Sequence, residues 1–153
     1  RLTGGANIDQ IYDDDYSFKI GKSITLKKGK DISIFASGTM MKVALDCSKI
    51  LRKSDIDAEV INMHTIKPID INKVNESAKK SKLIVSIEEH NIIGGLGSAI
   101  AECLVGIKNS PEQIFFGIND SYSEGGDYNF LKKKFNLTPN CISIKIISKF
   151  KGA

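Results

Sequence analysis

The fold class is decided by residues 83–98, which read LIVSIEEHNIIGGLGS. Residues 83–87 form the apolar run that is typical of a central strand in a parallel sheet. Polar residues follow at once, and Gly94–Ser98 then begins a helix in which Ile100, Leu104 and Ile107 recur at three-four spacing. A buried strand that leads into an amphipathic helix indicates a crossover unit, so the stretch favours an α/β domain.

The same alternation of strand and helix extends in both directions from this stretch. Further strands are predicted at residues 31–36, 58–63 and 113–118. Helices are predicted at residues 40–51, around Tyr128–Phe135, from Pro68 and Asp70 onward, and from Thr138 and Pro139 onward. The helix that begins near Asp70 is expected to bury Ile71, Val74 and Ala78. A short run at residues 24–26 precedes the turn Lys27–Lys30, which suits a hairpin with the strand at residues 31–36. We therefore expect a mostly parallel sheet, helices on both faces and one antiparallel strand at an edge.

The composition supports one globular domain and excludes several classes of protein. The chain has 153 residues, of which 41% are hydrophobic and 26% charged. No apolar run approaches the roughly 20 residues of a membrane span. The net charge of +4 is scattered, and Lys132–Lys134 is interpreted as a solvated helix face, so neither a membrane nor a nucleic acid is an expected partner.

The cysteines and the first residues bear on compartment and domain organisation. Cys47, Cys103 and Cys141 are far apart, form no C-x-x-C pair and sit among apolar residues, which favours reduced thiols in the cytoplasm and argues against zinc. The chain begins with Arg1, which suggests a piece of a longer protein. Residues 1–21 are interpreted as a linker or an extended arm, and the acidic trio Asp13–Asp15 as part of it.

Candidate functional residues gather where the predicted strands end, because ligands of open α/β sheets bind beyond the carboxyl ends of the strands. The candidates, called the rim below, are His64, Glu88, Glu89, His90, Asn91, Gly94, Gly95 and Gly97. Glu89 and His90 are residue types that act as acid–base pairs. Strand ends of such folds nevertheless collect polar residues in general, so an interface or supporting role is favoured over catalysis.

The glycine-rich start of the helix at residues 94–98 has two interpretations. Its amide groups are suited to receive an anion. It lacks the spacing of a dinucleotide fingerprint and the lysine of a phosphate-binding loop, however. Close packing of the helix on the sheet is therefore the favoured explanation of the glycines. These residues alone predict a fold and a polar rim. They do not indicate which reaction, if any, is catalysed.

Four stretches together resemble the C-terminal domain of transketolase-type enzymes that depend on thiamine diphosphate. They are residues 21–31 with their lysine-rich turn, residues 60–70 (VINMHTIKPID), residues 88–98 (EEHNIIGGLGS) and residues 123–126 (SEGG). The two central stretches are the specific ones. The resemblance covers nearly the whole chain, and it is strongest to transketolases split into N-terminal and C-terminal subunits.

The resemblance implies a three-layer α/β/α domain around a mostly parallel five-stranded sheet with one antiparallel edge strand. It implies transfer of a two-carbon ketol unit between sugars by an enzyme that holds thiamine diphosphate and a divalent cation, Mg or Ca, between a pyrimidine-binding and a diphosphate-binding domain. These domains are the expected partners, in a homodimer or a heterotetramer. The diphosphate motif Gly-Asp-Gly is absent, so no catalytic, cofactor-binding or metal-binding residue is expected in this chain, and the rim becomes a possible interface or wall of the substrate funnel.

In this interpretation residues 1–21 comprise the end of the pyrimidine-binding domain and a linker, and residues 22–153 form the C-terminal domain. Related enzymes that use phosphorylated sugars tend to have an arginine about where Gly4 falls. We therefore expect the enzyme to discriminate only weakly between phosphorylated and unphosphorylated acceptors, unless Arg1 takes the place of that arginine.

Alternatives within the thiamine group are the β subunit of 2-oxoacid dehydrogenases and deoxyxylulose phosphate synthase. From other classes, a non-enzymatic α/β interaction module and a small nucleotide-binding domain remain open, although the second lacks its glycine fingerprint.

Overall fold

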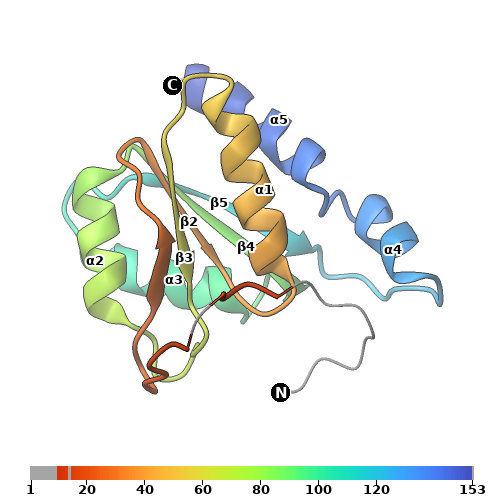
Figure 1. Cartoon of the computed structure of the whole chain (residues 1–153), viewed down its shortest axis with the longest axis horizontal. Coiled ribbons are helices and arrows are strands. Elements are labelled where there is room, and N and C mark those ends of the chain that lie inside the picture. Colours follow the sequence, from red (N-terminus) through yellow and green to blue (C-terminus); the bar gives the residue numbers. More distant parts are fainter. Residues whose placement is uncertain (1–9, 14, 153) are drawn as a thin grey trace.

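A computed structural model describes residues 10–13 and 15–152 of the protein (Figure 1). Within these residues the strands form one five-stranded sheet in the order β1-β3-β2-β4-β5. The strands are β1 (Ile24–Lys27), β2 (Ile32–Ala36), β3 (Ala58–Asn62), β4 (Leu83–Asn91) and β5 (Glu112–Ile118). β2 to β5 are parallel, and β1 lies antiparallel to β3 at one edge. The predicted fold class is thereby confirmed.

The predicted hairpin between the first two strands is wrong, because β1 pairs with β3 and not with β2. β2 is buried over its whole length and pairs with β3 on one side and β4 on the other, so it has no free edge. The turn before β2 instead lies against the start of β3. There the backbone N–H groups of Lys30 and Asp31 donate to Asp57 O, at 3.1 and 3.0 Å.

Helices cover both faces of the sheet. They are α1 (Met40–Arg52), α2 (Ile71–Lys80), α3 (Leu96–Val105), α4 (Tyr128–Lys134) and α5 (Pro139–Lys151). α1 and α5 pack side by side on one face, and α2 and α3 cover the other, each pair around its own apolar cluster (Figure 1). The chain thus has the three layers expected for an α/β/α domain.

Side-chain caps explain where three helices begin. Asp70, Asp127 and Thr138 accept hydrogen bonds from backbone N–H groups in the first turns of α2, α4 and α5. The expected buried face of α2 is only partly correct: Val74 and Ala78 are buried, whereas Ile71 in the first turn is 54% exposed. The three cysteines are free, and burial raises the pKa of Cys47 to about 12, so this thiol packs as an apolar group.

One carboxylate is buried beneath α2. Glu59 on β3 accepts hydrogen bonds from the ammonium groups of Lys73 and Lys80, both at 2.9 Å, and from the hydroxyls of Ser33 and Ser77, at 3.0 and 3.2 Å. Burial alone would raise the pKa of Glu59, but the two lysines and Ser33 outweigh it and hold the pKa below its ordinary value. This network ties α2 to the sheet at a distance from the rim along β3.

Candidate functional site at the carboxyl end of the sheet

The rim residues come from two strand ends that β2 separates in the sheet. His64 follows β3, whereas residues 88–91 form the end of β4, which extends beyond the residues that pair with β2. The loop of residues 92–95 then leads into α3. The structure therefore brings Glu88 and the three glycines together, and places His64 in a separate environment.

Glu88 fills the amino end of α3. Its side chain is buried, with 3% exposed, and its carboxylate accepts hydrogen bonds from the backbone N–H groups of Leu96 (2.7 Å) and Gly97 (2.8 Å). An anion at a helix amino end interacts favourably with the helix dipole and with free N–H groups. The helix end thus does hold an anion, and that anion is a carboxylate of the same chain.

The glycines at the start of α3 permit this arrangement. A Cβ on Gly95 would overlap Glu88 Oε2 and lie 2.7 Å from Asn91 O, and a Cβ on Gly97 would overlap the Phe115 ring and lie 2.7 Å from Ser86 Oγ. The expectation of close helix–sheet packing is therefore confirmed for Gly97. Gly94 serves the turn itself, since its φ of +74° is disfavoured for other residues.

Glu89 lies outside the core and binds two hydroxyl groups. It accepts a hydrogen bond from Thr39 Oγ1, beyond the end of β2, and one from Tyr128 Oη at 3.0 Å, at the start of α4. Burial, together with the hydrogen bond and charge of Glu89, raises the pKa of Tyr128, so the phenol remains a neutral donor. The contact of Tyr128 with Glu89 was missed at the level of sequence, where Tyr128 was only placed on a short helix that extends to Phe135.

His90 and Asn91 do not join Glu89 in an acid–base pair. The His90 ring is exposed, and its Nδ1 lies 3.1 Å from Asn91 O. Asn91 Nδ2 donates to Asp120 Oδ1 at 3.2 Å, and Asn91 Oδ1 accepts from the backbone N–H of Ile93 at 2.8 Å. Glu89 and His90 thus have different partners, and the geometry gives no support to catalysis by this pair.

His64 lies under an aromatic side chain from the N-terminal segment. Its ring is 4.6 Å from the Phe18 ring, centroid to centroid, and both of its nitrogen atoms are buried without a hydrogen-bond partner among the described residues. Burial lowers the pKa of His64, and the charge of Asp70 acts in the opposite direction.

The described residues do not fit thiamine diphosphate with a divalent cation. The helix end that would suit a diphosphate is occupied by Glu88. Across residues 10–13 and 15–152, no group of three or more His, Cys, Asp or Glu side chains could hold a metal ion. The expected position of an acceptor-binding arginine, at Gly4 or Arg1, lies outside the described residues.

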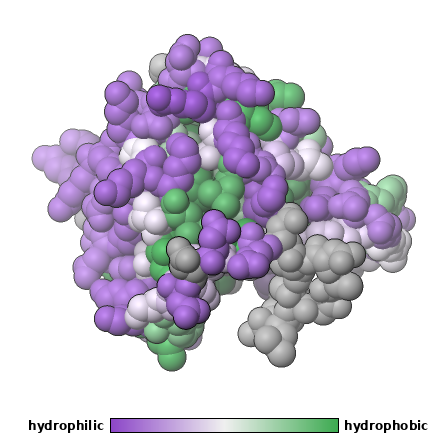
Figure 2. Space-filling view, viewed as in Figure 1, coloured by the Kyte–Doolittle hydropathy of each residue, from purple (hydrophilic) through white to green (hydrophobic). Residues whose placement is uncertain are grey.

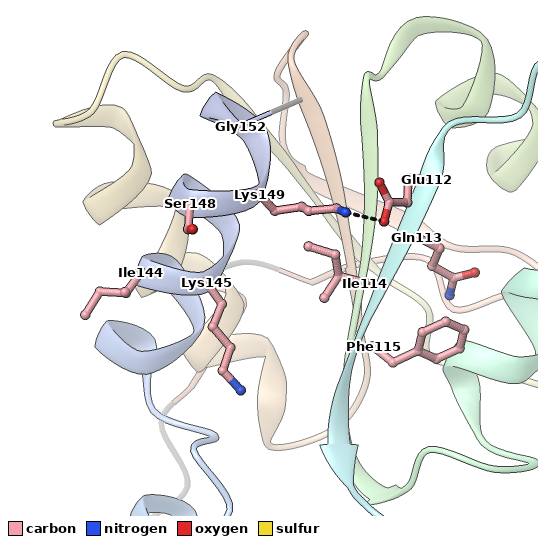
Figure 3. A pocket seen from close by; sticks show the side chains of 9 residues that line it. All are labelled: Glu112, Gln113, Ile114, Phe115, Ile144, Lys145, Ser148, Lys149 and Gly152. Atoms are coloured by element: carbon pink, nitrogen blue, oxygen red, sulfur yellow. Dashed lines mark ion pairs between the residues drawn. The ribbon is translucent and has the colours of Figure 1, made fainter.

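A hollow of about 720 Å³ lies away from the rim, between the edge strand β5 and α5 (Figure 3). Figure 3 shows Lys145 and Lys149 extending from α5 toward β5, where Lys149 Nζ is 2.6 Å from Glu112 Oε1. No rim residue lines this hollow.

Comparison with known families identifies the domain. Residues 21–142 match the family model described as "Transketolase, C-terminal domain". The chain belongs to this family.

Relatives of the transketolase C-terminal domain include subunits and longer enzymes. The chain is 41% identical over 130 residues to the 6-deoxy-6-sulfo-D-fructose transketolase subunit SqwH of Clostridium sp. (strain MSTE9), covering 84% of this chain and 40% of that protein. It is 35% identical over 135 residues to 1-deoxy-D-xylulose-5-phosphate synthase of Caldanaerobacter subterraneus subsp. tengcongensis, covering 88% and 22%. The chain thus spans less than half the length of these relatives.

A solved structure described as "Split gene transketolase, inactive beta4 tetramer" has the same fold. It superimposes with a TM-score of 0.86 at 35% sequence identity, over 93% of this chain and 46% of that one. No helix in the described part of this transketolase C-terminal domain is both long enough and apolar enough to cross a membrane.

Proposed function

We propose that this chain is the C-terminal domain of a thiamine diphosphate-dependent transketolase, and that it supplies assembly surface rather than catalytic groups. The enzyme as a whole would transfer a two-carbon ketol unit between sugars, with the cofactor and its Mg or Ca ion held by pyrimidine-binding and diphosphate-binding domains outside residues 22–153. The observation that carries this proposal is the position of Glu88, since the one glycine-rich helix start of the rim is occupied from within.

The partner surface in this proposal is the rim and the loops around it. Exposed apolar side chains occur here beside the polar ones: Ile66 follows β3, Ile93 lies in the loop before α3, and Tyr122 lies in the loop after β5. Figure 2 shows hydrophobic surface at the lower edge of the view, where the loops before β1 and α2 lie in Figure 1. Apolar groups at a surface with polar neighbours are typical of protein interfaces.

Two exposed aliphatic residues at opposite ends of α3 allow a matched test. Ile93, before the helix, is 66% exposed, and Val105, at its end, is 87% exposed. Ile93→Asp should weaken association of this domain with the rest of the enzyme, whereas Val105→Asp should not. Native mass spectrometry and ketol-transfer assays on the intact enzyme would measure both. Equal behaviour of the two variants would contradict an interface at the rim.

The chain by itself should neither bind thiamine diphosphate nor turn over ketose donors. Titration calorimetry of the chain with thiamine diphosphate and Mg²⁺ tests this, and micromolar binding would overturn the proposal. The homodimer or heterotetramer and the cytoplasm remain the proposed assembly and compartment.

The substrate class is proposed from two observations. The resemblance puts Gly4 about where related enzymes that use phosphorylated sugars tend to have an arginine, and the relative from Clostridium is named for a sulfo-sugar, 6-deoxy-6-sulfo-D-fructose. Both support a sugar whose terminal group is not a phosphate. The ratio of kcat/KM for phosphorylated and unphosphorylated acceptors, in the natural enzyme and in Gly4→Arg, tests it. A strong preference for phosphate that the substitution leaves unchanged would contradict it.

Deoxyxylulose phosphate synthase is a second candidate, supported by the 35% identity to the enzyme from Caldanaerobacter. Assay of the intact enzyme for 1-deoxy-D-xylulose 5-phosphate alongside ketol transfer separates the two functions.

A further inference from the structure

Unpaired polar atoms concentrate at the end of β3. Five buried side-chain nitrogen or oxygen atoms in the described part of the chain have no hydrogen-bond partner, and three of them belong to Asn62 and His64. Buried polar atoms are paired in most native structures, so each exception needs a physical account. Asn62 retains one partner, because its Nδ2 donates to Tyr12 Oη at 2.6 Å. His64 retains none.

The cover over His64 is a thin segment of chain. Residues 15–21, called the latch below, precede β1, and Phe18 in the latch places its ring against His64 although Phe18 itself is 55% exposed. Residues 15–20 are all exposed. The latch is held by the ring contact of Phe18 and by the backbone N–H of Gly21, which donates to Thr65 Oγ1 at 2.9 Å. Tyr16 also stacks on Tyr12, with 3.9 Å between the ring centroids. A segment with so few buried contacts opens at low free-energy cost.

The charge of His64 determines whether this cover is tolerated. A neutral imidazole carries one N–H donor and one acceptor nitrogen, so its burial here leaves two uncharged groups without a hydrogen bond. A protonated ring carries two N–H donors and a full charge, and burying these without an acceptor is far less favourable. The ring must therefore stay neutral while it is covered, or be exposed when it is protonated.

The charged groups around His64 do not remove this conflict. The Asp70 carboxylate, at the start of α2, acts on His64 through its charge, but it already accepts hydrogen bonds from Ser23 N (2.8 Å), Ser23 Oγ (3.1 Å) and Lys73 N (3.3 Å). Lys22, before β1, acts on Asp70 with the opposite charge. In the latch itself, Asp15 and Lys19 are exposed and solvated. Burial prevails over Asp70, and the pKa of His64 is lowered.

We propose that the latch is pH-dependent: neutral His64 packs beneath Phe18, and protonation of His64 releases residues 15–21 from the end of β3. The latch is closed at neutral pH and opens as the pH falls below about 6.5, the ordinary value for histidine. Release would separate the segment that leads into this domain from the end of β3. The proposal does not depend on which reaction the enzyme catalyses.

The sequence offers an internal control for the titration, since it contains only two histidines, His64 and His90, and no tryptophan. The Cε1–H signals of both histidines are followed by NMR from pH 8 to pH 4. We expect the midpoint of His64 to lie below about 6.5, the ordinary value for histidine. In Phe18→Trp, the emission of the single tryptophan should shift to the red with the same midpoint as His64, while far-UV circular dichroism stays constant over that range.

The combined variant Phe18→Trp with His64→Leu separates the latch from other titrations. Leucine fills the space under residue 18 and does not titrate, so the emission should then be constant through the same range. Three results would overturn the proposal: a midpoint of His64 at or above about 6.5, an emission change that persists in the His64→Leu background, or loss of the whole fold at the midpoint of His64.

Discussion

The backbone of Gly95 lies against the carboxylate of Glu88 so closely that a Cβ at position 95 would overlap Glu88 Oε2. Because the same carboxylate binds the first N–H groups of α3, the glycine and the glutamate form one unit. The missing side chain of Gly95 allows the Glu88 carboxylate to come close, and the carboxylate accepts hydrogen bonds from the first N–H groups of the helix. Their contribution is structural, and it accounts for this part of the motif without a bound ligand.

Gly95→Ala should therefore destabilise the domain by about 1–3 kcal/mol, because the carboxylate must leave at least one charge-assisted hydrogen bond. Gly106→Ala is the matched control: Gly106 ends α3 with helical φ and ψ, and a Cβ there meets nothing within 4 Å. It should be neutral or slightly stabilising, since alanine reduces the entropy of the unfolded chain. Urea unfolding measures both, and equal losses in the two variants would refute the steric account.

Glu88→Gln tests the carboxylate itself. The amide has one acceptor oxygen in place of two, and its NH₂ group would face a backbone N–H group. We expect a loss of about 1.5–3 kcal/mol in the free energy of unfolding. Glu89→Gln, one residue along the strand, should cost under about 1 kcal/mol because Glu89 is exposed to solvent. If Glu89→Gln proved the more damaging variant, the assignment of Glu88 as the anion of α3 would be wrong.

Tyr128→Phe should loosen α4 with little effect on the rest of the domain. The phenol is the group that reaches Glu89 from this helix, and no residue of α4 is buried. We expect amide hydrogen exchange to accelerate in residues 128–134 while exchange in β2 and β4 is unchanged. Tyr122→Phe is the control, since Tyr122 is fully exposed. Faster exchange in the central strands as well would show that Tyr128 supports the core and not only α4.

The elements of the sheet were predictable from local patterns, but the partner of β1 was not. The alternation of apolar strands and amphipathic helices shows which residues are buried. This pattern predicted the strands and helices to within a few residues of their observed ends. The run at residues 24–26 indicates a strand without indicating its neighbour, and a turn suited to a hairpin was available. β1 cannot pair with β2 because β3 and β4 already occupy both edges of β2, and this is evident only from the complete sheet.

The candidate site shows a similar limit. Polar residues at strand ends are visible in the sequence, whereas their partners come from distant segments: Thr39 and Tyr128 for Glu89, and Phe18 for His64. Glu88 and Glu89 are adjacent and chemically identical in the sequence. Only the position of α3 makes one a buried helix cap and leaves the other on the surface.

The buried network of Glu59 predicts how stability depends on acid. The pKa of Glu59 is lowered in the folded chain, so its stabilising contribution is complete above the pKa of the unfolded carboxyl, about 4.3, and is lost as the pH falls through the folded value. Glu59→Gln should therefore cost about 1.5–3 kcal/mol at pH 7, and the difference from the natural chain should shrink toward pH 3.

Glu76→Gln provides the control for this prediction, because Glu76 binds the same two lysines at 3.1 and 3.2 Å but lies at the surface of α2. An exposed ion pair contributes about 0–1 kcal/mol, so this variant should remain close to the natural chain across the whole pH range. Urea unfolding at several pH values between 3 and 7 measures both variants. A loss in Glu59→Gln that did not depend on pH would show that packing, and not the charge of Glu59, is what α2 requires.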